Sequence, residues 1–358
     1  DGIIDGGNAD VGVESTFIEF AEGKVRILRP GYITPEDLAE VVGAENVEID
    51  AAVLHGIGAQ EQPRSPGMKY RHYAPSAPVI AVTGGNWDCA REIRRGVRTH
   101  TGAAAILCDE YADLIPGKPL RVGPYGDYAA QAHRLFEALR ELDRPDVQII
   151  YAQCPDDRGI GLAVANRLKR AAGFHVVEAR RVTVLGLTGP TGAGKGVASR
   201  AFANAGAEVI DCDAVYHEML AHDEPLLTDL RTAFPAAFSQ GLLDRKALGR
   251  IVFQDEIELR RLNEVTHPHI RRRISELLKD CEQREVKLAV LDAPTLFESG
   301  ADKVCDFTVG VCALPEVRAA RIMTRDGLDG EYARLRISAG KPDDYYKNQC
   351  DFMIEKDR

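Results

Sequence analysis

The segment that decides the fold is residues 182–205, VTVLGLTGPTGAGKGVASRAFANA. Its apolar, β-branched beginning predicts a buried strand, and its alanine-rich end predicts a helix. The loop between them fits Gly-x4-Gly-Lys, with Gly189, Gly194 and Lys195 at the fixed positions. Because this pattern indicates a phosphate-binding loop when it joins a strand to a helix, we favour that interpretation over a glycine-rich turn without function.

A polyphosphate carries several negative charges that need hydrogen-bond donors once they leave water. Glycines let the backbone turn its N–H groups inward, and the N-terminus of the following helix adds a partial positive charge. Lys195 supplies a mobile charge for the β- and γ-phosphates. The predicted ATP phosphate-binding residues are Gly189, Gly192, Ala193, Gly194, Lys195, Gly196 and Val197.

One position departs from the usual loop. Gly196 follows Lys195, where most such loops place the Ser or Thr that holds Mg²⁺, and Val197 offers no hydroxyl either. We expect ATP and Mg²⁺ as cofactors, with the metal held by phosphates, water and carboxylates elsewhere. The sequence itself assigns no metal ligand.

Two carboxylates follow the next predicted strand, residues 207–210, at Asp211 and Asp213. The carboxyl ends of the strands are the edge at which α/β sheets bind ligands, so both acids are expected beside the phosphate-binding loop. One of them is also placed to cap a helix that begins near Ala214. We assign the functional role to Asp213 and leave the role of Asp211 open.

Residues 183–358 resemble the dephospho-coenzyme A kinases of coenzyme A biosynthesis. Beyond the loop, the resemblance is carried by 209–213 (VIDCD), 243–245 (LDR) with Leu248, 267–268 (HP) with Ile270, 291–298 (LDAPTLFE), Arg321, 325–326 (RD) and Arg336. The departures from the family pattern are Gly196, Gly340 in place of a usual Gln, and 355–357 (EKD) in place of an Asn-x-Gly stretch near the adenine.

The resemblance implies a kinase that transfers the ATP γ-phosphoryl group to the ribose 3′-hydroxyl of dephospho-coenzyme A. Asp213 would act as base or positioning group at that hydroxyl, beside Lys195. Arg325, on a lid-like helix, would screen the charge of the transferring group. Arg245 and His267 are further candidates for contacts with the coenzyme A substrate, although His267-Pro268 is equally placed to end one helix and start another.

The first half of the chain alternates strand and helix patterns. Such alternation predicts a mainly parallel sheet with covering helices. The predicted strands are 13–20, 25–28, 79–82, 103–107 and 147–151, and the predicted helices are 88–98, 128–141, 160–172 and one that starts after the Thr34 cap. Prolines at 63, 66, 75 and 78 predict an extended linker over residues 59–78.

This half resembles the two-domain L-threonylcarbamoyladenylate synthases, nucleotidyltransferases that make threonylcarbamoyl-AMP from threonine, bicarbonate and ATP for tRNA modification. The resemblance is carried by 5–7 (DGG), 11–16 (VGVEST), 27–31 (ILRPG), the linker stretch 65–75 (SPGMKYRHYAP), 159–161 (GIG) and 166–168 (NRL). It implies nucleotide-phosphate contacts for Ser15 and Arg29. Tyr70 and His72 would close the linker over the site, or else pack between domains.

The predicted architecture is a multidomain α/β chain. Its parts are a partial YrdC-type domain at 1–50, a linker at 51–77, a Rossmann-like parallel domain at 78–182 and a P-loop kinase domain at 183–358. The strand-like start at Asp1 and the early stop at Arg358 indicate truncation at both ends. The resemblance lacks the catalytic N-terminal half of the synthase domain, so synthase activity is not expected from this chain unaided.

The amino-acid composition limits the classes of binding partner and the cellular location that we expect. Asp and Glu outnumber Lys and Arg by 55 to 45, a net charge of −10 that favours small nucleotide substrates over tight tRNA binding. No apolar run approaches the ~18 residues of a membrane helix, and no signal peptide pattern is present. The eight scattered cysteines indicate buried free thiols in a reducing compartment, so we expect a cytoplasmic protein, with its oligomeric state open.

Two alternatives to kinase activity stay open. The chain's principal activity is that of the synthase, or the kinase part is degenerate and the chain is a nucleotide- or RNA-associated scaffold. Gly196 favours the scaffold, whereas Lys195, Asp213 and Arg325 together favour the kinase.

Overall fold

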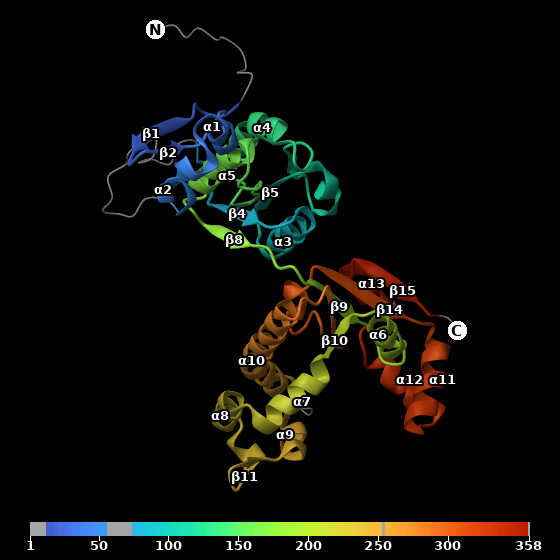
Figure 1. The fold of residues 1–358 in the computed structure, drawn as a ribbon. Coiled ribbons are helices and arrows are strands. Elements are labelled where there is room, and N and C mark those ends of the chain that lie inside the picture. The colour runs from blue at the N-terminus through green and yellow to red at the C-terminus, as the bar shows by residue number, and fades with distance from the viewer. Residues whose placement is uncertain (1–11, 56–73, 253–254, 357–358) are drawn as a thin grey trace. The chain divides into compact units, whose positions relative to one another are not determined.

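The computed structural model describes residues 12–55, 74–252 and 255–356. The chain divides into two compact units, Asp1–Arg180 and Arg181–Arg358, and each is described by itself (Figure 1). Both units are built around a parallel β-sheet with helices against it, which confirms the predicted multidomain α/β class. The finer division into four parts stays a prediction.

Unit 1 opens with a small sheet in which β1 (Phe17–Ala21) pairs antiparallel with β2 (Lys24–Arg29), and β3 (Val47–Ile49) pairs parallel with β2. Helix α1 (Pro35–Val42) starts at the predicted Thr34 cap. The Thr34 hydroxyl accepts the Asp37 backbone N–H at 3.1 Å, and the Asp37 carboxylate accepts the Thr34 N–H in return. The other elements here are η1 (Ala44–Asn46) and α2 (Ala51–His55).

The larger sheet of unit 1 has the order β6-β5-β7-β4-β8, and every pairing in it is parallel. Its strands are β4 (Val79–Thr83), β5 (Ala103–Leu107), β6 (Leu120–Arg121), β7 (Ile149–Gln153) and β8 (Val176–Glu178). Its helical elements are α3 (Asn86–Thr99), η2 (Asp109–Leu114), α4 (Tyr128–Glu141) and α5 (Ile160–Ala171). The three helices predicted for this segment are therefore confirmed to within two residues at each end.

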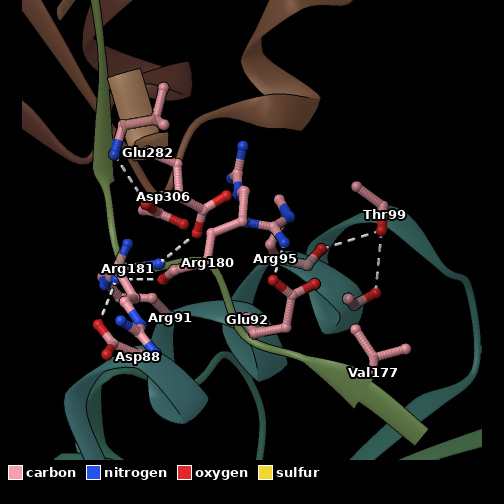
Figure 2. A network of polar contacts seen from close by, with 12 residues as sticks. Asp88, Arg91, Glu92, Arg95, Thr99, Val177, Arg180, Arg181, Glu282 and Asp306 are labelled. Carbon is pink, nitrogen blue, oxygen red and sulfur yellow. Dashed lines mark hydrogen bonds and ion pairs between the residues drawn. The ribbon is translucent and has the colours of Figure 1, made fainter. Parts of the chain in front are cut away.

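A buried arginine of α3 links this helix to the last residue of unit 1. The Arg91 side chain is only 2% exposed, and its guanidinium donates to Asp88 at 2.6 Å and to the Arg180 carbonyl at 2.7 Å (Figure 2). A buried charge needs such partners to offset its lost hydration. In unit 2, the Arg181 N–H donates to Glu282 at 2.9 Å.

Unit 2 holds a five-stranded parallel sheet of order β10-β13-β9-β14-β15. Its strands are β9 (Thr183–Thr188), β10 (Glu208–Asp211), β13 (Leu288–Asp292), β14 (Phe307–Cys312) and β15 (Phe352–Glu355). The strand that precedes the phosphate-binding loop, β9, therefore lies at the centre of the sheet. The register pairs Asp211 with Asp292 and Asp292 with Leu187, so three carboxyl ends meet at one edge.

Helices pack against both faces of this sheet. On one face, Leu187, Val290 and Val309 pack with α6 (Lys195–Asn204). On the other, Val184, Ile210 and Leu291 join a larger core that includes Leu226, Leu230, Ile274 and Leu278. The remaining elements are α7 (Cys212–His222), α8 (Glu224–Ala233), η3 (Pro235–Ala237), β11 (Phe238–Ser239), β12 (Leu242–Leu243), α9 (Arg245–Val252), α10 (Glu256–Gln283), η4 (Ala301–Val304), α11 (Pro315–Asp326), α12 (Gly330–Ser338) and α13 (Asp343–Gln349).

The interpretation of His267-Pro268 as the junction of two helices is wrong. Helix α10 is continuous from Glu256 to Gln283, and Pro268 lies inside it. Proline has no N–H to give to the carbonyl four residues earlier, but tertiary packing outweighs that lost bond. Thr266, Ile274 and Leu278 of this helix are all buried.

In the described part of the chain, no helix combines the length and the apolar character that crossing a membrane requires. All eight cysteines are free, and six of them are buried, which confirms the expected buried thiols.

Candidate active site

The loop after β9 has the backbone that its glycines predict. Gly189 and Gly194 have φ angles of 151° and 101°, which side chains on L-residues rarely tolerate. A Cβ at Gly189 would also lie 2.3 Å from the Val311 carbonyl oxygen. Helix α6 begins at Lys195, and Gly194 at its N-cap provides no side-chain cap, so the first N–H groups of the helix remain available to a ligand.

Two arginines of α11 hold the loop from its carbonyl side. Arg318 Nε donates to the Thr191 carbonyl at 3.0 Å, and Arg321 donates to the Ala193 carbonyl at 2.8 Å. Because the C=O and N–H of a peptide point in opposite directions, fixing these carbonyls also fixes where the loop's amides point. Arg318 is 3% exposed and also pairs with Asp343 at 3.0 Å.

The loop lysine meets a carboxylate that the sequence-based site lacked. Lys195 makes an ion pair with one oxygen of Asp292, the last residue of β13. The other oxygen of Asp292 accepts the hydroxyl of Ser199. Asp292 ends an apolar strand just as Asp211 does, and that signal was available in the sequence.

The two acids after β10 have different roles. Asp211 is the N-cap of α7 and accepts the backbone N–H groups of Asp213 at 2.9 Å and Ala214 at 3.0 Å, which confirms the capping alternative. The Asp213 carboxyl makes no such cap. The surrounding protein displaces water from it and raises its pKa, an effect that the nearby Lys195 ammonium opposes.

A pocket of about 140 Å³ opens beside Asp213. His267 lines it, and partial burial, assisted by the Arg271 charge, lowers the pKa of this histidine. The imidazole is therefore neutral at pH 7 and offers one donor and one acceptor. Other lining residues are Cys212, Tyr216, Asn263, Thr266 and Pro294.

Arg245 lies at the start of α9 and contacts the His217 ring. His217 is four residues after Asp213 on α7, so both lie on one face of that helix. The structure thereby brings Arg245 to the neighbourhood of Asp213, as a substrate-binding role requires.

Arg325 is not brought to the loop in this structure. Its side chain is 61% exposed at the end of α11, and it forms a two-bond pair with Asp326 at 2.7 and 2.8 Å. Arg336 of α12 contacts the same carboxylate at 2.5 Å. The three charges form a surface network between α11 and α12.

In unit 1, the structure brings two predicted residues together. Arg29 Nε donates to the Ser15 carbonyl at 3.0 Å, and Ser15 itself is exposed. Tyr70 and His72 lie outside the described residues, as does most of the predicted linker.

The donor set at the sheet edge fits magnesium. Mg²⁺ prefers oxygen ligands and is usually bound by one or two carboxylates together with phosphates and water. Asp292 supplies a carboxylate beside the loop, and the Ser199 hydroxyl donates a hydrogen bond to it. Among the described residues, no cluster of three or more His, Cys, Asp or Glu could hold a metal by itself, so phosphate oxygens would complete the site.

Comparisons with known proteins match units 1 and 2 to two different families. Residues 183–358 match the family model "Dephospho-CoA kinase", and residues 33–173 match "Threonylcarbamoyl-AMP synthase, C-terminal domain". The dephospho-CoA kinase of Rhodopseudomonas palustris strain CGA009 is 34% identical over 172 residues, which cover 48% of this chain and 85% of that protein. That of Agrobacterium fabrum is 33% identical and 88% covered.

The threonylcarbamoyl-AMP synthase of Pyrococcus abyssi is 37% identical over 188 residues, 49% of this chain and 50% of that protein. The chain thus spans about half the length of the curated synthases that it matches.

Solved structures of both kinds are similar to parts of the chain. Pyrococcus abyssi Sua5 complexed with L-threonine has a TM-score of 0.43 at 34% identity, covering 49% of this chain and 50% of that one. A dephospho-CoA kinase from Campylobacter jejuni has a TM-score of 0.38 at 26% identity, covering 49% and 88%. On the sequence matches of residues 183–358, the chain belongs to the dephospho-CoA kinase family.

Proposed function

We propose that residues 183–358 catalyse the ATP-dependent phosphorylation of the ribose 3′-hydroxyl of dephospho-coenzyme A. The observation that carries this proposal is the meeting of Lys195, Asp292 and Asp213 at one sheet edge, beside a pocket. Family membership supports the choice of substrate. Without ligand, Lys195 pairs with Asp292, and in the complex its ammonium exchanges that carboxylate for the phosphate oxygens.

The acceptor side rests on Asp213. The 3′-hydroxyl would lie in the pocket with its proton directed at the Asp213 carboxylate, which accepts the proton as the oxygen attacks the γ-phosphorus. A raised pKa brings this base closer to working pH, the condition in which general base catalysis is most effective. Neutral His267 and the Arg245 guanidinium would orient the substrate.

Magnesium supplies charge neutralisation to the β- and γ-phosphates when it is bound. Asp292 is the residue of this chain that would hold it. Arg325 would leave Asp326 and turn toward the transferring phosphoryl group, an exchange that its exposed position permits. The reaction returns ADP and coenzyme A.

A coupled ADP-release assay with dephospho-coenzyme A tests the proposal. Lys195→Ala should lower kcat by at least about a hundredfold, because the mobile charge on the phosphates is lost. Lys279→Ala, which removes an exposed lysine on α10, is the matched control and should leave the rate unchanged. Equal rates for Lys195→Ala and wild type would overturn the kinase proposal and favour the scaffold.

The Arg29–Ser15 contact favours a second candidate function, participation of unit 1 in threonylcarbamoyl-AMP synthesis. Threonine-dependent release of pyrophosphate from ATP, with bicarbonate present, tests it. We expect no release from residues 1–358 alone, and release once the unmatched N-terminal half of a relative is joined to them. Absence of release from the joined protein would contradict this candidate. The cytoplasmic location expected from the sequence stays a prediction.

A further inference from the structure

The phosphate-binding loop lacks one hydroxyl, and the helix that follows it carries another nearby. Gly196 stands where loops of this pattern place the Ser or Thr that holds Mg²⁺. Ser199 is three residues further along α6, and residues three apart lie on the same face of a helix. The chain therefore has a hydroxyl on the correct face, one turn deeper.

The contacts of Ser199 show what this hydroxyl does. Ser199 is 8% exposed, and its hydroxyl donates to Asp292, which is also 8% exposed. A helical serine more often bonds back to the carbonyl four residues earlier, so a bond to another element is a specific arrangement. Lys195 and Ser199 together hold the two oxygens of a single carboxylate from the same helix.

We propose that Ser199 is a positioning residue for magnesium that replaces the hydroxyl missing at Gly196. It fixes the Asp292 carboxylate so that this group is already oriented toward the metal of Mg·ATP when Lys195 turns to the phosphates. The inference rests on the ATP site of the proposed function. It assigns to Ser199 an effect on the metal and none on nucleotide contacts.

The physical reason is preorganisation. An aspartate that loses its lysine partner regains its side-chain torsions, and binding a metal must then restrict them again. Groups that orient a metal ligand typically contribute 10–100-fold to metal affinity. A hydroxyl bond to a buried carboxylate is of this kind.

The test is ATP binding by isothermal titration calorimetry on the full chain, in excess Mg²⁺ and in EDTA. Ser199→Ala should weaken binding about tenfold in Mg²⁺ and less than about twofold in EDTA. Ser199→Thr, which keeps the hydroxyl, should retain the wild-type values. Thermal unfolding verifies that each variant is folded. If Ser199→Ala is not folded, Ser199→Cys, which replaces the hydroxyl by a weaker S–H donor, takes its place.

A rescue variant sharpens the test. Gly196→Ser restores the usual hydroxyl, and a Cβ at this position has no closer neighbour than an Arg200 nitrogen at 3.9 Å. The double variant Gly196→Ser/Ser199→Ala should recover the affinity in Mg²⁺ that Ser199→Ala loses. A purely structural role for Ser199 would show no such recovery.

Three outcomes would overturn the inference: Ser199→Ala binding Mg·ATP like the wild type, an equal loss in Mg²⁺ and EDTA, or a wild-type chain whose ATP affinity is independent of Mg²⁺. The titration contains no dephospho-coenzyme A, so it tests the Ser199 inference separately from the kinase proposal. Failure of the kinase proposal would appear as normal Mg·ATP binding without phosphorylation of dephospho-coenzyme A.

Discussion

In the proposed reaction, the Asp213 carboxylate is the general base. Its environment raises its pKa above the ordinary value of 3.8, so protonation begins to remove the base at a higher pH than for an exposed aspartate. Below that pKa the neutral carboxyl accepts no proton. We therefore expect kcat/KM to fall as pH is lowered through this raised value.

Asp213→Asn should lower kcat by about 10²–10⁴-fold and remove this acidic limb. Steady-state rates measured across pH provide the check. Asp211→Asn is the control, because asparagine caps a helix as well as aspartate does and the limb should persist. A persistent limb in Asp213→Asn would show that another group titrates.

The thermal stability of the Asp213→Asn variant provides a second, independent measurement on this residue. A carboxyl whose folded pKa is raised stabilises the fold at pH values below its unfolded pKa, and that contribution is lost as pH rises through the folded pKa. At neutral pH the ionised Asp213 is therefore unfavourable, and Asp213→Asn should unfold at the same temperature as wild type or higher. A loss of activity would then not reflect unfolding.

At the scale of single residues, the sequence predicted the loop, Lys195 and Asp213, because each depends on neighbours in the chain. Asp292 was missed although it ends an apolar strand, and Ser199 was missed because its bond to Asp292 joins positions far apart in the chain. The Arg325 expectation concerns a ligand-bound state, and its present partner is its own neighbour, Asp326. Which acid caps α7 was settled only by the backbone that follows β10.

At the scale of elements, α11 acts as a backing for the phosphate-binding loop. Arg318→Met should leave the Thr191 carbonyl without its donor and Asp343 without its partner. Water reaches the partly exposed Asp343, but the Thr191 carbonyl left without its donor costs about 1–3 kcal/mol, so thermal unfolding should shift downward. ATP affinity should fall about tenfold, because the loop amides lose their orientation.

Arg334→Met, an exposed position on α12, is the control and should change neither quantity. Wild-type ATP affinity in Arg318→Met would refute the role of this helix as a backing. The three arginines at 318, 321 and 325 recur at helical spacing, so the sequence held a signal for a basic face on this helix. The sequence held no signal for which loop carbonyls this basic face contacts.

Helix α10 illustrates where element prediction stops. The missing N–H of proline favours a helix break at Pro268. The helix continues because apolar residues before and after Pro268 pack in the same core. The strands and helices predicted between residues 79 and 172 lie within two residues of those observed, since their periodicity and turn residues agree with the final packing. The predicted strand 13–20 is observed at Phe17–Ala21, and the short elements β3, α2, β6 and β8 were not predicted.

At the scale of the whole molecule, the two compact units should unfold as separate cooperative transitions. Differential scanning calorimetry in the presence of Mg·ATP is the measurement. A ligand at about 100 times its Kd stabilises its host by about 2.7 kcal/mol, so the midpoint of one transition should rise while the other stays in place. Equal shifts of both transitions would contradict independent units.

The order of strands in unit 2 has a consequence for synthesis on the ribosome. β9 emerges before the other strands of its sheet, yet both of its partners, β13 and β14, are translated much later. Until then the backbone N–H and C=O groups of β9 have no partner strand, and its apolar side chains are uncovered. Such a segment is prone to chaperone binding or aggregation. Every growing chain passes through this interval, and the phosphate-binding loop has no contact with Arg318 and Arg321 until these late residues are translated.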